Sequence, residues 1–183
     1  MNALDLLLTR SSQPKLQAPA PEGEALENIK QAALRAPDHA SLKPWEFVVC
    51  KGEGLQRLGK ILQDSAIAEG KEQESIDRAL QLPQRAPMVI VAMTRYAEHP
   101  KVPQFEQTQS TACAVQAMQM AAVAQGFQGI WRTGSYAQSD FVKAAFGLAE
   151  QDEIVGFLYL GTSCLKAMPK PKIDSADYFT TWS

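Results

Sequence analysis

A stretch of small and apolar residues from Thr111 to Ala124 constrains the fold of this chain more than any other feature. Its length and pattern predict a helix over Phe105 to Gln125. A surface helix normally has one apolar stripe and one polar face. Because this helix lacks a polar face, we expect a homodimer that buries it, so that a Glu at Met118 or Ala121 would be a buried, unpaired charge that dissociates or unfolds the protein. The alternative is a central helix wrapped by its own chain.

Residues 33–49 join a helix end, a polar loop and a half-buried strand. Pro37 disfavours helical dihedrals at the residue before it, so the helix is expected to stop there. The loop then offers hydrogen-bond donors and acceptors from Asp38, His39, Ser41 and Lys43. Alternating Trp45, Phe47 and Val49 begin a strand. This layout is typical of a cofactor-binding loop, although an ordinary connection beside a core Trp has the same pattern.

Two further segments carry residues suited to a phosphate and to a flat ligand. Arg10, Ser11 and Ser12 follow an apolar helical turn. A planar guanidinium beside two hydroxyls suits a phosphate, but Arg-Ser pairs are also common in solvated loops. Beyond the long helix, Gly129 and Gly134 would let backbone amides approach a flat ligand closely.

Together, Arg10-Ser-Ser12, the Ala-Pro-Asp-His…Lys-Pro-Trp-Glu-Phe loop and Gly-Ile-Trp-Arg-Thr-Gly134 resemble the FMN-dependent nitroreductase family. The order of the segments matches too, and the likeness, nearest to the short YdjA-like branch, runs from Ala3 to about Thr162. The resemblance implies an α+β fold with a central mixed β-sheet flanked by helices. It also implies a homodimer with a long buried central helix and non-covalent FMN at the subunit interface.

The resemblance also assigns residues to the cofactor. Those expected at FMN are Arg10, Ser11, Ser12, Arg35, His39, Lys43, Trp131, Arg132 and Thr133. The chain departs from the family pattern at Ser11, where many members carry a basic residue, and at Ser41 and Lys43, which replace the usual Asn and Gln. If Lys43 points at the pyrimidine edge of the flavin, its charge would stabilise the reduced, anionic form.

The activity implied by the resemblance is transfer of hydride from NAD(P)H to FMN and then to a nitro compound, a quinone or a similar acceptor, in a ping-pong cycle. Because the flavin carries the chemistry, no side chain is expected as general acid, base or nucleophile. The departures at Ser41 and Lys43 keep an alternative open, a non-catalytic protein that binds, scavenges or senses flavin. The sequence does not distinguish NADH from NADPH.

Charge and composition disfavour several other classes of function. A net charge of -2 and a pI near 5.7 argue against a nucleic-acid partner. The amino terminus lacks a charged region before its apolar stretch, and no run is long enough to span a bilayer, so we expect a cytoplasmic protein without a membrane partner. Cys50, Cys113 and Cys164 lie far apart in apolar or strand-like settings. They are expected to be buried thiols, with no metal site.

Hydrophobic periodicity predicts the elements of one domain over residues 1–183. Helices are expected at Ala3 to Thr9, Glu24 to Arg35, Leu55 to Ile67, Glu74 to Leu82, Phe105 to Gln125 and Asp140 to Phe146. Strands are expected at Glu46 to Cys50, Met88 to Thr94, Gln128 to Arg132 and Ile154 to Leu160. An irregular stretch follows from Ser163 to Asp174. The aromatic, β-prone ending Tyr178 to Trp182 is unusual for a free terminus, and in the family such a tail docks on the partner subunit.

Overall fold

The computed structural model describes residues 2–165 and 173–183. Its strands are β1 (Leu16–Gln17), β2 (Trp45–Lys51), β3 (Met88–Thr94), β4 (Gln128–Arg132) and β5 (Glu153–Ser163). Its α-helices are α1 (Ala3–Thr9), α2 (Gly23–Ala33), α3 (Glu53–Ala68), α4 (Gln73–Gln81), α5 (Gln104–Ala124), α6 (Ser135–Gln138) and α7 (Asp140–Ala145). Short 3-10 helices are η1 (His39–Ser41), η2 (Leu82–Arg85) and η3 (Ser175–Asp177).

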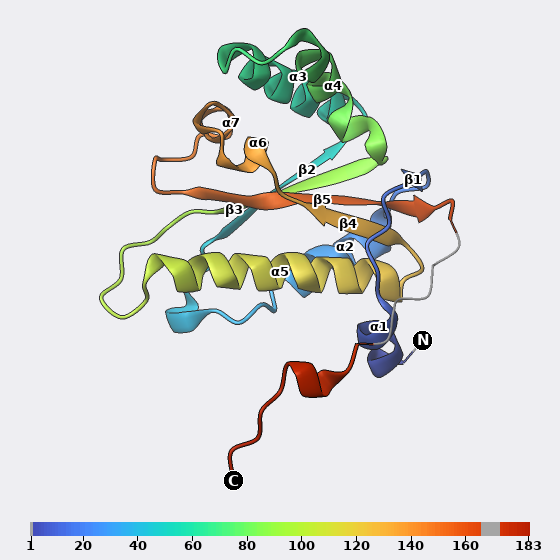
Figure 1. The fold of residues 1–183 in the computed structure, drawn as a ribbon, viewed down its shortest axis with the longest axis vertical. Helices are drawn as coiled ribbons and strands as arrows, with labels where there is room; N and C mark the ends of the chain where they lie inside the picture. The colour runs from blue at the N-terminus through green and yellow to red at the C-terminus, as the bar shows by residue number, and fades with distance from the viewer. Residues whose placement is uncertain (1, 166–172) are drawn as a thin grey trace.

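The sheet lies between two helical layers, with α3, α4, α6 and α7 on one face and α2 and α5 on the other (Figure 1). The α+β class and the flanking helices agree with the prediction. Every strand pair described is antiparallel, so the prediction of a mixed sheet is wrong. The reason is the strand order. The crossover through α5 makes β3 and β4 run in the same direction, but β5 lies between them and pairs antiparallel with both.

Strand β3 separates two hydrophobic cores, and all of its residues are buried. Successive side chains of a strand point to opposite faces of the sheet. Val89, Val91 and Met93 therefore join the core under α3 and α4. Met88, Ile90 and Ala92 face α2 and α5. Burial on both faces explains why this strand is a continuous apolar run rather than an alternating one.

Helix α5 packs one side of its surface against the chain's own core. Buried residues on that side include Ala114, Val115, Met118 and Ala122. Met118 is only 1% exposed, so its own chain already covers it, and a charge placed there would be buried without a partner subunit. The opposite side carries Cys113, which is exposed, and Ala117 and Met120, which are half-buried. This outer side of the helix is therefore only partly covered by the described residues.

The three cysteines differ in exposure, contrary to the prediction that all are buried. Cys50 is buried, whereas Cys113 and Cys164 are exposed. Cys113 lies on the outer side of α5, where sequence pattern alone does not distinguish an inner from an outer position.

The aromatic tail is exposed, with Trp182 at 95%, and its docking on a partner stays a prediction. The stretch expected to be irregular begins at Ser163, which is the last residue of β5. Residues 166–172 of that stretch lie outside the described part of the chain. No helix among the described residues is both long enough and apolar enough to cross a membrane.

Candidate functional site

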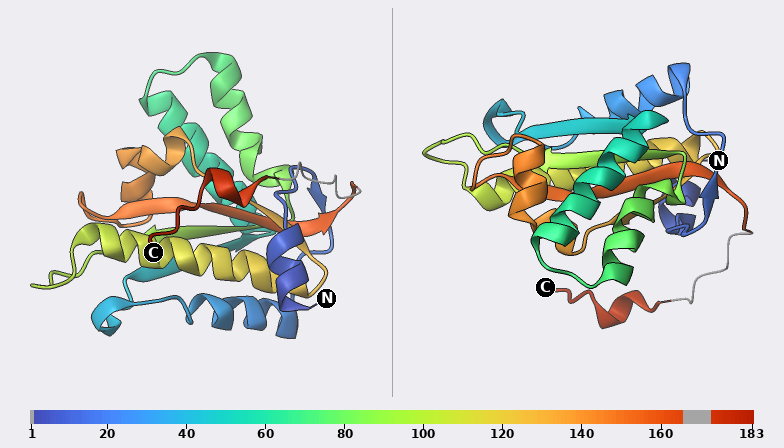
Figure 2. Two further views of the ribbon diagram at one scale, coloured as in Figure 1. Left: turned by 60° about the horizontal axis from the view of Figure 1, so that its bottom comes forward. Right: turned by 90° about the horizontal axis from the view of Figure 1, so that it is seen from above.

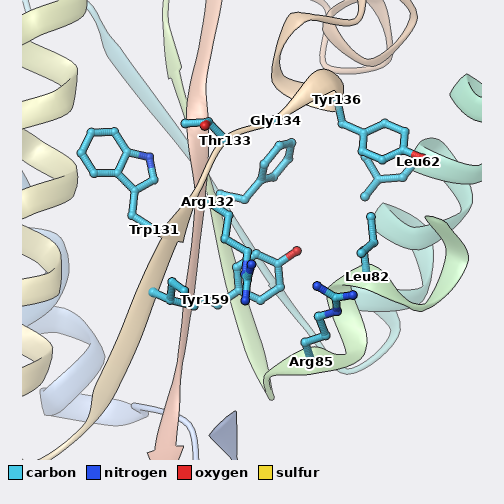
Figure 3. Close-up of a pocket in the computed structure, with 11 residues that line it drawn as sticks. Leu62, Leu82, Arg85, Trp131, Arg132, Thr133, Gly134, Tyr136 and Tyr159 are labelled. Atoms are coloured by element: carbon cyan, nitrogen blue, oxygen red, sulfur yellow. The ribbon is translucent and has the colours of Figure 1, made fainter. Parts of the chain in front are cut away.

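A cavity of about 430 Å³ lies between the β4 and β5 edge of the sheet and the α3–α4 layer (Figure 3). Its volume is in the usual range for small-molecule sites, about 300–1,000 Å³. The lining residues come from five elements and the loop after β4: Leu62, Leu82, Arg85, Ile130, Trp131, Arg132, Thr133, Gly134, Tyr136, Phe157 and Tyr159. Three of the residues predicted at the cofactor, Trp131, Arg132 and Thr133, therefore line one cavity.

Strand alternation sends the side chains of Trp131 and Arg132 to opposite faces of β4. The Trp131 indole points away from the Arg85 side of the cavity, as Figure 3 shows, and its Nε1 donates a hydrogen bond to the carbonyl of Val155 at 3.2 Å. The Arg132 guanidinium lies over the Tyr159 ring, 5.9 Å from its centre. Gly156 makes room for the indole, because a Cβ there would lie 2.9 Å from the Trp131 Cδ1 atom.

The cavity is electropositive. Among the described residues, neither Arg85 nor Arg132 forms an ion pair with a carboxylate. The Nε of Arg132 is buried and has no hydrogen-bond partner. Burial raises the pKa of the Tyr159 phenol, and the positive charges of Arg132 and Arg85 oppose that rise. A buried donor without a partner costs about 1–3 kcal/mol, so this wall suits a ligand that brings hydrogen-bond acceptors.

The loop before β2 has a strained backbone that Asp38 holds in place. Ala40, Ser41 and Lys43 have positive φ angles of 59°, 55° and 51°. Such angles are uncommon outside glycine and cluster at functional sites. The Asp38 carboxylate accepts hydrogen bonds from the backbone N–H groups of Leu42 at 3.1 Å and Lys43 at 2.8 Å. Asp38 therefore shapes the loop, a role that the sequence pattern did not reveal.

This loop is attached to the amino-terminal half of α5. His39 Nδ1 lies 2.8 Å from the Glu106 carboxylate, and the Ser110 hydroxyl donates to the carbonyl of Pro37 at 2.6 Å. Arg35 is exposed just after α2, near the same end of α5. Lys43 lines a separate groove of about 420 Å³ beside α2 and β2. The predicted contact of Lys43 with the flavin edge therefore finds no support from the cavity of its own subunit.

The phosphate-type segment lies at the opposite end of α5, as the views in Figures 1 and 2 agree. Arg10 ends α1, and its N–H donates to the carbonyl of Leu6. The backbone N–H of Gln13 and the side chain of Gln119 both donate to the Gly129 carbonyl at 3.0 Å. The 21 residues of α5 span about 30 Å. A single chain therefore does not bring Arg10, Ser11 and Ser12 together with His39.

Sequence reasoning missed the three lining residues that carry a further guanidinium or a phenol. Arg85 ends η2, Tyr136 lies on α6 and Tyr159 lies in β5. None belongs to one of the three cofactor-type segments, because each reaches the cavity through the packing of its element. An Arg between two short turns before a buried strand gives no signal by itself.

Comparison with known proteins identifies the group to which the chain is similar. The model of the nitroreductase family matches residues 7–162. The Escherichia coli (strain K12) protein named "Putative NAD(P)H nitroreductase YdjA" is 50% identical over 182 residues, which cover 100% of both chains. A nitroreductase-like family protein from Bacillus cereus superposes with a TM-score of 0.85 at 23% identity, covering 100% of this chain and 96% of that one. A nitroreductase from Bacteroides fragilis, solved with bound FMN, gives a TM-score of 0.75 at 22% identity and covers 100% of both chains.

Proposed function

The chain belongs to the nitroreductase family, and we propose that it is an FMN-dependent oxidoreductase that takes electrons from NAD(P)H. The acceptors are nitro compounds, quinones or similar electrophiles. One observation carries the proposal: a ligand-sized cavity lined by Trp131, Arg132 and Thr133, with an unpartnered buried donor at Arg132 Nε. The NAD(P)H nitroreductase name of the Escherichia coli relative and the FMN bound to the Bacteroides fragilis structure support the same assignment.

The lining of the cavity offers groups that suit a flavin. A flavin is flat and aromatic on its faces and rich in acceptors along one edge. The cavity offers aliphatic and aromatic walls at Leu62, Ile130 and Phe157, and guanidinium donors at Arg85 and Arg132. Bound FMN would supply the hydride-accepting and electron-transferring chemistry. The side chains of this protein would then bind and orient the cofactor and exclude water from it.

The phosphate of FMN is assigned to Arg10, Ser11 and Ser12, because a guanidinium fork and short hydroxyl donors bind a phosphate well. Arg35 and His39 lie at the other end of α5, too far away to share that ligand within one chain. A two-fold axis across the outer side of α5 would bring the loop of one subunit toward the phosphate residues of the other. We therefore propose a homodimer whose sites are built from both subunits.

The outer side of α5 supplies the surface for that dimer. Cys113, Ala117 and Met120 follow one another at helical spacing on this side. Leu4, Leu7 and Leu8 of α1 are also exposed, and α1 packs near the same helix. Large apolar side chains gathered on one surface are typical of an interface between subunits.

The test is reduction of the purified protein under anaerobic conditions. The protein is expected to be yellow and to release FMN on denaturation. Stopped-flow mixing with NADH or NADPH should bleach the flavin rapidly, and an added nitroaromatic or quinone should restore the colour. A protein that only stores or senses flavin would keep FMN but show no rapid bleaching by either nucleotide. A colourless protein that does not take up FMN would contradict the assignment altogether.

A further inference from the structure

We propose that Arg85, together with Arg132, contacts the acceptor-rich pyrimidine edge of the flavin and raises its reduction potential, an inference that rests on the proposed function. Neither sequence pattern nor family resemblance assigns a role to Arg85. Lys43 lines a different groove of its own subunit, and its contact with the flavin edge stays a prediction.

The two guanidiniums reach the cavity from unrelated elements. Arg85 ends η2, which buried Pro83 anchors, and Arg132 ends β4. Figure 3 shows both side chains beside the ring of Tyr159, which is only 5% exposed. Arg85, Arg132 and Tyr159 all line the same cavity. The pair therefore forms one cationic wall although the residues are far apart in the sequence.

Arg132 is half-buried, as is Arg95 elsewhere in the protein, whereas Arg85 is exposed at the mouth of the cavity. Arg95 pairs with Glu46 and with Asp152, and it also donates to the carbonyls of Phe146 and Gly147. The described residues give Arg85 and Arg132 no such carboxylate, and the Arg132 Nε is left without any partner. Two like charges in one cavity repel each other. Such an arrangement is favourable when a ligand supplies the missing acceptors.

The pyrimidine edge of a flavin provides those acceptors. It carries two carbonyl oxygens and a ring nitrogen, which suit the planar donor fork of a guanidinium. Reduction adds negative charge to this edge. A fixed positive charge in a partly dry cavity stabilises the reduced form more than the oxidised form, and this difference raises the reduction potential.

The experiment compares Arg85→Met and Arg132→Met with a control variant, Arg57→Met. Arg57 is an exposed arginine of α3 that does not line this cavity. FMN affinity is measured by titration of the apoprotein, and the midpoint potential by spectroscopic redox titration against a reference dye. Loss of a charge-assisted contact should weaken FMN binding about tenfold or more in both test variants. Their potentials should become more negative, whereas the control should match the wild type in both measurements.

Arg85→Lys keeps the charge but loses the fork, so it should bind FMN more weakly while its potential stays above that of Arg85→Met. It also provides the test if Arg85→Met fails to fold. One outcome would overturn this inference and leave the proposed function intact: the wild type binds FMN, but the Arg85→Met or Arg85→Lys variant has the same FMN affinity and the same reduction potential as the control. Weaker binding with an unchanged potential in Arg85→Met would overturn the electrostatic role. Wild-type protein that does not bind FMN would overturn both.

Discussion

Replacement of Gly156 by Ala is expected to disturb the cavity, because Gly156 packs against Trp131 and Arg132 at the end of β4, and this part of β4 lines the cavity. Gly156 has a φ angle of 149°, which favours glycine. A Cβ at this position would lie 2.6 Å from the carbonyl oxygen of Arg132 and 2.9 Å from the Trp131 Cδ1 atom. Both contacts are too close, so the end of β4 must move away from β5.

The cost follows from two separate effects. A non-glycine residue in a sparsely populated backbone conformation costs about 1–3 kcal/mol. Overpacking a well-packed region costs about 1–3 kcal/mol more. The free energy of unfolding should therefore fall by about 2–6 kcal/mol. Each kcal/mol lowers the Tm of a protein of this size by about 2–4 °C, so the Tm should fall by at least about 4 °C.

Thermal unfolding of the apoprotein measures the stability loss, and FMN titration measures the effect on the site. Gly54→Ala is the matched control, because its Cβ would meet only the Cys50 Cβ, at an ordinary distance of 3.7 Å. This residue lies in the first turn of α3, where Ala is favoured over Gly, so stability should stay equal or rise. A Gly156→Ala protein with the wild-type Tm and the wild-type FMN affinity would refute the reasoning.

Four further substitutions test the phosphate contact, the interface and a titrating network. Arg10→Ala should weaken FMN binding by about 1.5–3 kcal/mol in calorimetric titration, since a charge-assisted contact is lost; an unchanged Kd would contradict the assignment. Met120→Glu should give a monomer in sedimentation, whereas Met118→Glu should unfold the chain by placing an unpaired charge in its core; a Met120→Glu dimer at micromolar concentration would contradict the interface. Glu69 accepts hydrogen bonds, chiefly from Ser139, that hold its pKa below the ordinary value of 4.5. A carboxylate whose pKa is lower in the folded state stabilises the fold at pH values above its unfolded pKa, and this contribution is lost as the pH falls through the folded pKa. Glu69→Gln should therefore make the free energy of unfolding depend less on pH below about pH 4.5, as measured by chemical denaturation.

The sequence by itself determined most of the local structure. The bounds of α1, β3 and β4 agree with prediction, and the other predicted helices and strands differ only near their ends, most at β5. Apolar periodicity and helix-stopping residues act over a few neighbouring positions, so they can be read without the fold. The short elements β1 and α6 were missed, because two to four residues carry too little pattern. The three cofactor-type segments and their order also came from the sequence, and with them the family.

Only the tertiary structure decided how these segments relate in space. It placed β5 between β3 and β4, which made the sheet antiparallel. It put Met118 in the core and Cys113 outside, although both lie on one apolar helix. It also brought Arg85 beside Arg132 and separated Arg10 from His39 by the length of α5. Each of these outcomes depends on pairing and packing between residues distant in the chain, and local propensity carries no information about such contacts.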